Sequence, residues 1–409
     1  MHEIILINIS GRDRAGITAT LSEVLGRYNV EVLDFGQAVI HDFLTWGMLV
    51  VVPSEATSSS VFKELLFEAH RLELDIRFTP VSDDRYEQWV EDKDQARHTI
   101  TLLGRAVTAR HIAEVSRILA RHDFNIVRIT RISGRRSLAT PIDRSRAAIE
   151  LAIRGDTPDI ATVRTQLLNL ANESELDIAI QADDVYRRYR RLVCFDMDST
   201  LIQGEVIDDL GKIAGVEAQI AEITARAMHG DMSFAESLSE RLTLLKGLDE
   251  SALESVAQSL TLTEGAERLI STLKELGFKI AILSGGFTYF ANRLREALDI
   301  DYAYAHELDI VDGKLTGRIK GDVIDGDKKA ELLRSIANRE GIKLEQVIAV
   351  GDGANDISML SIAGLGIAFH AKPAVHQHAQ HAISTLGLDG ILYLLGMRDR
   401  ELPDWETRR

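Results

Sequence analysis

The sequence predicts an α/β protein in which two copies of a small βαββαβ unit precede a doubly wound parallel sheet. Three observations support this fold class. Residues 1–184 contain an internal repeat. From residue 190 onward, short apolar runs alternate with helical patterns, as they do in a parallel sheet. Residues 202–262 are almost wholly helical in pattern and form an insertion between the first two strands of that sheet.

Gly11-Arg12 and Gly104-Arg105 open matching segments within the two copies of the repeat. Each copy starts with a β-rich run and continues into an amphipathic helix, whose apolar residues recur at spacings of three and four. The runs are Ile4–Ile9 and Thr99–Leu103, and the helices are Ile17–Tyr28 and Ile112–His122. The repeat therefore predicts the same local order in both copies.

An extended pair, a second helix and a last strand complete each copy. In the first copy these are Val30–Ile40, Leu44–Val52, Val61–Leu72 and Ile76–Phe78, and in the second Phe124–Ile132, Ala147–Ile153, Ile160–Ala171 and Ile178–Ile180. The order βαββαβ matches the ferredoxin-like arrangement. We expect two such domains, at residues 1–84 and 96–184, with the polar segment 86–97 linking them.

The third predicted domain covers residues 190–409. Its expected parallel strands are Leu192–Phe195, Lys279–Leu283, Gln346–Val350 and Leu365–Ala368. Asp312-Gly313 predicts a hairpin turn between two further strands. We expect the segment 183–191 to link the second copy to this domain, and the basic run Arg187, Arg188, Arg190 and Arg191 to flank that linker.

Composition narrows the possible functions. The 409 residues carry a formal net charge of −16, which argues against nucleic acid and anionic membranes as partners. No apolar run approaches the length of about 20 residues that crosses a bilayer. A single cysteine, Cys194, lies in an apolar run and is expected in the core, and the N-terminus lacks a signal-peptide pattern. These features predict a cytoplasmic protein.

Two aspartates, Asp196 and Asp198, directly follow the first expected strand of the third domain. Ligand-binding groups gather at the carboxyl ends of strands in such sheets. Two like charges at this spacing are unfavourable unless a cation lies between them. By itself the pattern also fits an ordinary Asx-rich turn.

Three further features point to one site at this edge of the sheet. Ser284-Gly285-Gly286 follows the second strand and suits a phosphate, because such a turn exposes backbone N–H groups. Gly351-Asp352-Gly353-Ala354-Asn355-Asp356 places more carboxylates at the end of the third strand. Lys328-Lys329 opens the intervening helix and offers a cation.

The order Asp-x-Asp-Ser-Thr, Ser-Gly-Gly, Lys and Gly-Asp-Gly-Ala-Asn-Asp resembles the haloacid dehalogenase superfamily of phosphotransferases, and within it the phosphoserine phosphatases. The repeat at 1–182 resembles two ACT domains, which often bind amino acids. The combination resembles the mycobacterial-type phosphoserine phosphatases along nearly the whole chain. It implies a haloacid-dehalogenase-like domain whose insertion, at about residues 202–262, is a helical cap.

The resemblance implies a role for each site residue. Asp196 would attack phosphorus and form an aspartyl phosphate, and Asp198 would act as general acid and then base. Mg²⁺ would be held by Asp196, Asp352 and the backbone carbonyl of Asp198. Ser284, the Gly285 N–H and a lysine would bind phosphoryl oxygens; Lys329 precedes a small residue and an acid, as in the family, although Lys328 remains open. Asp356 would orient Asp352 or the lysine, or is a simple acid at a helix N-terminus.

The expected substrate is O-phospho-L-serine, hydrolysed in the last step of serine biosynthesis. By resemblance, Glu205 binds the substrate ammonium, Arg241 binds its carboxylate, and Asn355 makes a further contact. Met228 and Phe234 would line the inner face of the cap. Without the resemblance, such residues would be read as core side chains or solvated charges.

The ACT pair is expected to bind an amino-acid regulator such as serine, with the first copy favoured because Gly16 precedes its helix, or else to serve only folding. Exposed sheet edges predict a homodimer. Two alternatives stay open: a phosphatase for phosphoproteins or other small phosphomonoesters, and an amino-acid sensor with an inert phosphatase domain. A metal site at His376, His378 and His381 is the less favoured interpretation of a helix expected on the surface.

Overall fold

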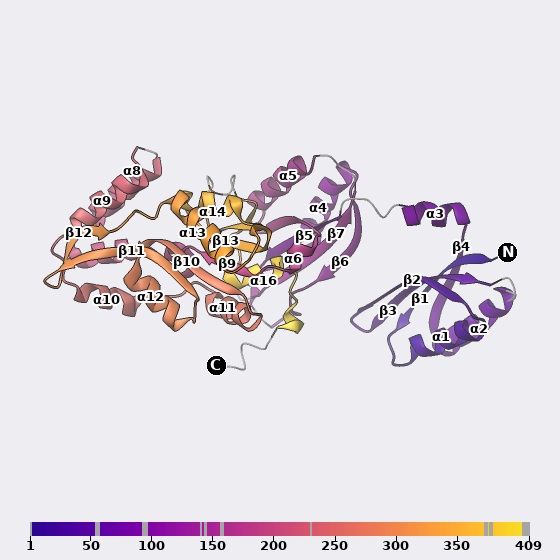
Figure 1. Cartoon of the computed structure of the whole chain (residues 1–409). Helices are drawn as coiled ribbons and strands as arrows, with labels where there is room; N and C mark the ends of the chain where they lie inside the picture. Colours follow the sequence, from indigo (N-terminus) through magenta and orange to yellow (C-terminus); the bar gives the residue numbers. More distant parts are fainter. Residues whose placement is uncertain are drawn as a thin grey trace. The chain divides into compact units, whose positions relative to one another are not determined.

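The chain folds into two compact units, residues 1–95 and 96–409. The computed structural model describes residues 2–53, 58–91, 97–139, 141–142, 145–155, 159–229, 231–371, 375 and 379–402, without the side chains of Ser58 and Met228. The path of the chain through both units is shown in Figure 1.

The first unit is a four-stranded antiparallel sheet with two helices packed on one face. Its elements are β1 (Glu3–Arg12), α1 (Ile17–Arg27), β2 (Glu31–Ile40), β3 (Phe43–Val52), α2 (Ser58–Arg71) and β4 (Leu74–Val81). The strand order is β2-β3-β1-β4, so β2 lies at an edge. Alternate residues of β3 are buried against the helices. A further helix, α3 (Asp83–Glu91), occupies part of the segment that the sequence predicted as a linker.

The second unit begins with the second copy of the repeat. It contains β5 (Arg97–Gly104), α4 (Ala109–Arg121), β6 (Asn125–Arg131), β7 (Ala147–Arg154), α5 (Ile160–Glu173) and β8 (Asp177–Ala182). The order β6-β7-β5-β8 repeats that of the first sheet. The prediction of two βαββαβ units is therefore confirmed.

A seven-stranded sheet forms the centre of the second unit, in the order β12-β11-β10-β9-β13-β14-β15. Its strands are β9 (Leu192–Phe195), β10 (Lys279–Phe287), β11 (Tyr302–Val311), β12 (Lys314–Lys320), β13 (Val347–Gly351), β14 (Leu365–Phe369) and β15 (His381–Ile383). All neighbours are parallel except β11 and β12, which form the hairpin predicted from Asp312-Gly313. Both of these turn residues have positive φ.

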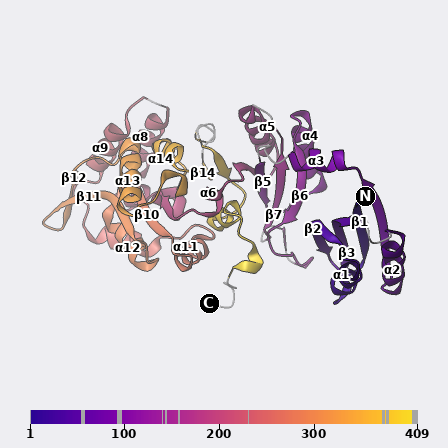
Figure 2. The ribbon, with the colours of Figure 1, turned by 45° about the vertical axis from the view of Figure 1, so that its right-hand side comes forward.

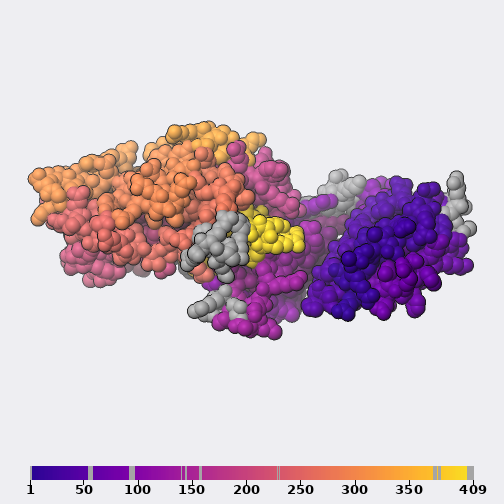
Figure 3. All heavy atoms as spheres, turned by 90° about the horizontal axis from the view of Figure 1, so that it is seen from below, coloured from indigo at the N-terminus to yellow at the C-terminus, as the bar shows by residue number. Residues whose placement is uncertain are grey.

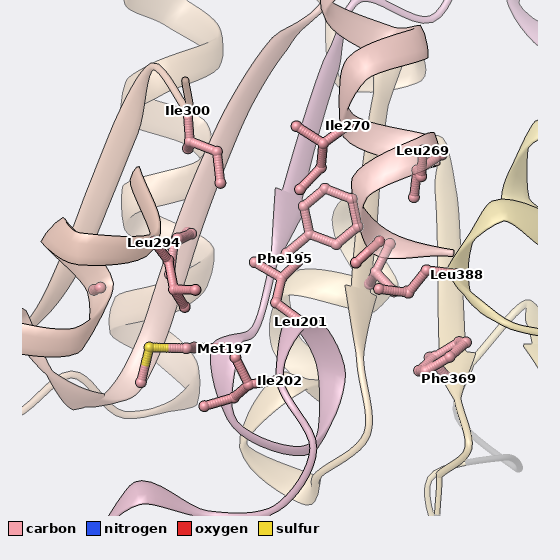
Figure 4. Close-up of a cluster of buried hydrophobic side chains, with 14 of the residues drawn as sticks. Phe195, Met197, Leu201, Ile202, Leu269, Ile270, Leu294, Ile300, Phe369 and Leu388 are labelled. Atoms are coloured by element: carbon pink, nitrogen blue, oxygen red, sulfur yellow. The ribbon is translucent and has the colours of Figure 1, made fainter. Parts of the chain in front are cut away.

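Helices cover both faces of this sheet (Figure 1). They are α11 (Ala266–Glu275), α12 (Thr288–Ala297), α13 (Gly326–Arg339), α14 (Ile357–Ile362) and the short α16 (Ile391–Leu394). The residues of β9 alternate between two cores: Val193 and Phe195 pack with α11 and α12, whereas Leu192 and Cys194 pack with α13 and α14. Figure 4 shows Phe195 at the centre of the first core. The central strands are thus apolar on both sides, as the doubly wound prediction requires.

The predicted insertion forms the helices α7 (Val206–Ala214), α8 (Glu217–His229), α9 (Phe234–Leu244) and α10 (Ser251–Ser259). An antiparallel bridge between Ile202 and Leu262 joins the two chain segments that enter and leave it. Helix α9 packs on β12 (Figure 2). Residues of the insertion line a cavity together with Asp196 and Asp352, which follow β9 and β13, so the insertion lies over the carboxyl end of the sheet.

Polar contacts join the second βαββαβ copy to the large sheet. The Asp177 carboxylate accepts hydrogen bonds from Ser384 N, Thr385 N and Thr385 Oγ1 at 2.9, 2.9 and 2.6 Å. Asp399 accepts a hydrogen bond from Gly134 N. The last part of the chain that the structure describes is yellow in Figure 3 and is visible at the surface. The second copy and the sheet therefore share one compact unit.

Two expectations about charged residues are wrong. The basic run does not simply flank a linker, because the short helix α6 (Val185–Arg188) buries Arg187, which pairs with Glu150, and Arg190 is buried beside Glu345. His381 does not lie on a surface helix; it is buried on β15, and burial lowers its pKa to about 3. His376 and His378 lie outside the described residues.

Candidate active site

The two aspartates of the first motif lie where β9 ends. Asp196 N donates to Val350 O on β13 at 2.9 Å, so the chain keeps its sheet pairing up to this residue. The next five residues, Met197–Leu201, form a turn in which Asp198 has an extended backbone and Ser199 has a positive φ of 55°. This turn directs the Asp196 and Asp198 side chains toward the cap, and both are at least nine-tenths buried.

Lys329 joins two of the predicted acids. Its Nζ lies 2.8 Å from Asp196 Oδ2 and 2.7 Å from Asp356 Oδ1, and its side chain is fully buried. The Asp325 side chain caps α13 and starts the helix so that Lys329, in its first turn, faces the sheet. Burial alone would lower the pKa of Lys329, but Asp196 and Asp356 outweigh it and raise the pKa. The neighbouring Lys328 points outward and pairs with Glu331.

Three carboxylates gather in a cluster that suits a divalent cation. One oxygen each from Asp196, Asp352 and Asp356 lies within 4.8 Å of the others. Burial, Asp356 and Glu205 raise the pKa of Asp352 to about 7, and burial with Asp356 raises that of Asp196 well above its usual range. A hard cation would relieve this repulsion, and carboxylate oxygens are the ligands that Mg²⁺ prefers. The donor set therefore fits a metal ion.

Asp198 is placed to hold a proton. Its Oδ1 accepts from Val206 N at 2.8 Å, and its Oδ2 lies 3.4 Å from Ser284 Oγ. Burial and the nearby Glu205 raise its pKa to about 8, so the group is largely protonated at neutral pH. A carboxylic acid of this kind can donate a proton to a leaving oxygen.

The Ser284-Gly285-Gly286 turn is an irregular stretch within β10, where the pairing with β11 shifts register, and it closes the other side of the site. Gly286 N donates to Ser284 Oγ at 2.8 Å. A Cβ at Gly286 would come within 2.5 Å of Asp198 Oδ2, and one at Gly285 would come within 2.8 Å of the Phe234 ring. The absence of a side chain at Gly286 therefore lets Asp198 approach the backbone, and its absence at Gly285 does the same for Phe234 of the cap.

A cavity of about 590 Å³ lies between this edge of the sheet and the cap. Eight of the predicted site residues line it: Asp196, Asp198, Glu205, Phe234, Arg241, Gly285, Asp352 and Asn355. Ser284, Lys329 and Asp356 lie behind that wall and contact its members. The Met228 side chain lies outside the described part of the chain.

The cavity also contains residues that sequence reasoning missed. They include Ser199, Asp208, Thr224, Met232, Ser237 and Leu238. Asp208 follows Glu205 by three positions and so shares its side of α7, which is a signal that the spacing could have given. Ser237 likewise precedes Arg241 by one helical turn, and its carbonyl accepts from Arg241 Nε at 3.3 Å.

Charged side chains of both signs surround the cavity, at its floor and on the cap. Carboxylates and Lys329 surround its floor at the sheet edge. On the cap, Arg241 is mostly buried, and Glu205 and Asp208 counter the lowering of its pKa by burial.

Among the described residues, no helix combines the length and apolar character needed to cross a bilayer.

Three family models match the chain. A haloacid dehalogenase-like hydrolase model matches residues 190–364, and ACT domain models match residues 3–79 and 96–181. These matches agree with the resemblance inferred from the motifs and with the two βαββαβ units.

Curated relatives and solved structures extend this likeness. The phosphoserine phosphatase of Streptomyces coelicolor is 39% identical and aligns over 98% of this chain and 94% of its own length. Phosphoserine phosphatase SerB2 of Mycobacterium tuberculosis is also 39% identical, over 97% of this chain and 94% of its own. A crystal structure of a probable phosphoserine phosphatase from Vibrio cholerae has a TM-score of 0.56 at 36% identity and covers 73% of this chain and 86% of that one.

The alignments to the two curated relatives cover nearly the whole chain and so include all three domains. The chain is an enzyme of the phosphoserine phosphatase family, in which a haloacid dehalogenase-like hydrolase domain follows two ACT domains.

Proposed function

We propose that this enzyme hydrolyses O-phospho-L-serine to L-serine and phosphate through an aspartyl phosphate on Asp196. The observation that carries the proposal is the cavity itself, with Asp196 in its floor and Arg241 and Glu205 among its lining residues from the cap. The names of the relatives give the same substrate for those proteins.

In the first half-reaction, an Asp196 oxygen attacks phosphorus and the ester bond to the serine oxygen breaks. Asp198 gives its proton to that oxygen, so serine leaves as a neutral alcohol. Lys329 and the Ser284 hydroxyl stabilise charge on the phosphoryl oxygens. The ion pair with Lys329 holds Asp196 in place and favours its charged form, against the burial and the neighbouring acids that raise its pKa.

In the second half-reaction, Asp198, now a carboxylate, takes a proton from a water molecule that attacks the phosphorus. The bond from phosphorus to Asp196 breaks, which restores the carboxylate and releases phosphate. Asp196, Asp352 and the backbone carbonyl of Asp198 would hold Mg²⁺, which supplies positive charge beside the phosphoryl group. Asp356 holds Lys329 in its position.

The cap would select serine. Arg241 suits a carboxylate because its guanidinium can form two parallel hydrogen bonds, and Glu205 suits the ammonium group. Phe234 lies over Gly285 and would exclude water from the phosphoryl group. Asn355 lines the same cavity and would contact the substrate.

Phosphate release by the purified protein tests the proposal. We expect Mg²⁺-dependent release from O-phospho-L-serine, with much weaker release from O-phospho-L-threonine and from a phosphoserine peptide. Preference for the peptide would keep the chemistry but reject the role of the cap. Failure on every substrate would favour an inert domain used for sensing.

We also propose that the first ACT domain binds an amino-acid regulator such as serine. The N-cap residue of α1 is Gly16, which has a φ of 94° and no side chain to cap the first N–H groups. In the second copy the equivalent N-cap residue is Thr108, whose hydroxyl accepts from His111 N. The open N-terminus of α1 suits a carboxylate. Serine-dependent protection of α1 from hydrogen exchange would support this site, whereas protection confined to the second copy would contradict it.

A homodimer through β2 is a further proposal. This edge strand exposes the apolar side chains of Val32, Phe35, Val39 and Ile40. A second copy of the chain would cover them and pair the free edge. Light scattering should give twice the mass of one chain, and Val32→Glu should lower this mass.

We also propose a cytoplasmic location and a role in the last step of serine biosynthesis, on the strength of the sequence resemblance.

A further inference from the structure

His306 is a buried side chain on β11 whose partners fix its tautomer. Its Nδ1 lies 3.0 Å from Gly285 O and 3.2 Å from Gly286 O, and its Nε2 lies 2.7 Å from Ile324 N. A carbonyl oxygen can only accept and a backbone N–H can only donate. Nδ1 must therefore carry the proton and Nε2 must accept. Burial lowers the pKa of His306, which agrees with a neutral ring.

The peptide between Gly285 and Gly286 connects this ring to Ser284. Its carbonyl accepts from His306, and its N–H donates to Ser284 Oγ at 2.8 Å. A peptide unit is planar, so fixing the carbonyl also fixes the direction of the N–H. Because that N–H donates to Ser284 Oγ, it helps to fix where this oxygen lies. The position of the Ser284 hydroxyl thus depends on the His306 imidazole through two hydrogen bonds, one to the Gly285 carbonyl and one from the Gly286 N–H.

The same ring contacts two other parts of the site. Ile324 lies just before Asp325, the residue that caps the helix bearing Lys329. The Phe234 ring of the cap stacks near the imidazole, with ring centroids 6.4 Å apart and an angle of 26° between the planes. His306 therefore joins the Ser284 turn, the start of the Lys329 helix and the cap.

We propose that His306 is a positioning residue that holds the Gly285–Gly286 peptide so that Ser284 presents its hydroxyl to the phosphoryl group. The inference rests on the proposed phosphoryl transfer at Asp196. It predicts that the Nδ1–H donor matters for catalysis and phosphate binding, whereas the Nε2 acceptor mainly supports the fold around Ile324.

Two substitutions separate these roles. His306→Asn places an amide nitrogen near the position of Nδ1, so it can still donate to the Gly285 carbonyl. His306→Gln places its amide near the position of Nε2, so it can still accept from Ile324 N. His306→Leu removes both functions. The readouts are kcat and KM on O-phospho-L-serine, the affinity for orthovanadate as a phosphoryl mimic, and the melting temperature.

We expect His306→Asn to keep kcat and vanadate affinity within about threefold of the parent, and His306→Gln and His306→Leu to lose about 10- to 100-fold in both. The losses should not follow the order of melting temperatures. Equal activity of the Asn and Gln variants, or losses that track melting temperature in all three, would overturn the inference.

Failure of the proposed function gives a different pattern. If the parent enzyme does not act on O-phospho-L-serine, the same comparison is made with para-nitrophenyl phosphate and with vanadate binding, neither of which depends on the serine group. A parent that neither cleaves a phosphomonoester nor binds vanadate would contradict the phosphoryl site itself and, with it, the role of His306.

Discussion

Lys329 and Asp196 form a buried ion pair in which Nζ lies 2.8 Å from Oδ2, and the same Nζ also contacts Asp356. One positive charge therefore holds both the proposed nucleophile and a second acid of the cluster. Because the side chain of Lys329 is fully buried, its charge acts in a medium of low dielectric constant.

Lys329→Met should reduce kcat on O-phospho-L-serine by about 10²- to 10³-fold, because it removes a cation from the phosphoryl oxygens. It should also destabilise the protein, since two buried carboxylates lose their partner. Lys328→Met is the matched control, because that side chain pairs with Glu331 at the surface. Steady-state kinetics of both variants decides between the two lysines. A larger loss in the Lys328 variant would reverse the assignment.

Arg241→Met should raise KM for O-phospho-L-serine by about 10- to 100-fold, because a buried carboxylate loses its charged partner. The same change should barely affect O-phosphoethanolamine, which has the ammonium but no carboxylate. Arg226→Met is the control, because Arg226 is half exposed and pairs with Glu240. Equal losses on both substrates would mean that Arg241 does not bind the carboxylate.

Asp352→Asn should stabilise the metal-free protein at high pH while abolishing its response to Mg²⁺. The folded pKa of Asp352 is raised from 3.8 to about 7, so its contribution to stability is complete below pH 4 and is lost as the pH rises through 7. The difference in melting temperature between variant and parent should therefore grow from pH 5 to pH 8, by about 2–4 °C for each kcal/mol.

Other buried groups, such as His381, make the protein more stable as the pH rises. They are the same in the parent and in Asp352→Asn, so their effect cancels when the two melting temperatures are subtracted. In the parent, Mg²⁺ should raise the melting temperature at pH 8, because the cation replaces the missing proton. A difference that is flat or falls with pH would show that the acidic cluster is not under electrostatic strain.

Asp177→Ala should weaken the attachment of the second ACT domain to the catalytic domain. The change leaves the N–H groups of Ser384 and Thr385 without the carboxylate, at a cost of about 1–3 kcal/mol for each group left unsatisfied. We expect a lower melting temperature and faster proteolysis near residues 183–191. Asp183→Ala removes an exposed acid in that segment and serves as the control. An unchanged melting temperature for Asp177→Ala would contradict the role given to this contact.

Much of the architecture was predictable because it depends on local patterns. The spacing of apolar residues at 17–28 and 112–122 indicated the helices, and runs such as Leu192–Phe195 indicated buried strands. The carboxyl ends of parallel strands meet at one edge, so motifs far apart in the sequence could be assigned to one site. The choice between Lys328 and Lys329 could be made from the sequence only by resemblance. In the structure, α13 begins after its N-cap Asp325, and this start buries Lys329 at the site.

Other features depend on contacts between distant segments that no local pattern reveals. From the sequence, Arg187 was expected only to flank a linker, because nothing local reveals Glu150, which lies beside it on β7 of the second ACT domain. His306 lies in a strand with no motif, and its contacts with Gly285 and Gly286 arise only when β11 pairs with β10. The helix at 83–91 was missed because its sequence is polar and, in the described part of the chain, it buries no residue.

The central claim is that Asp196 carries the phosphoryl group during turnover. Acid quenching of the enzyme with O-phospho-L-serine in the steady state, followed by borohydride reduction and peptide mass spectrometry, tests it most directly. We expect homoserine at position 196, formed by reduction of an acyl phosphate, and none when Asp196→Asn is treated in the same way. Trapped phosphate on a different residue, or turnover by Asp196→Asn close to that of the parent, would contradict the account.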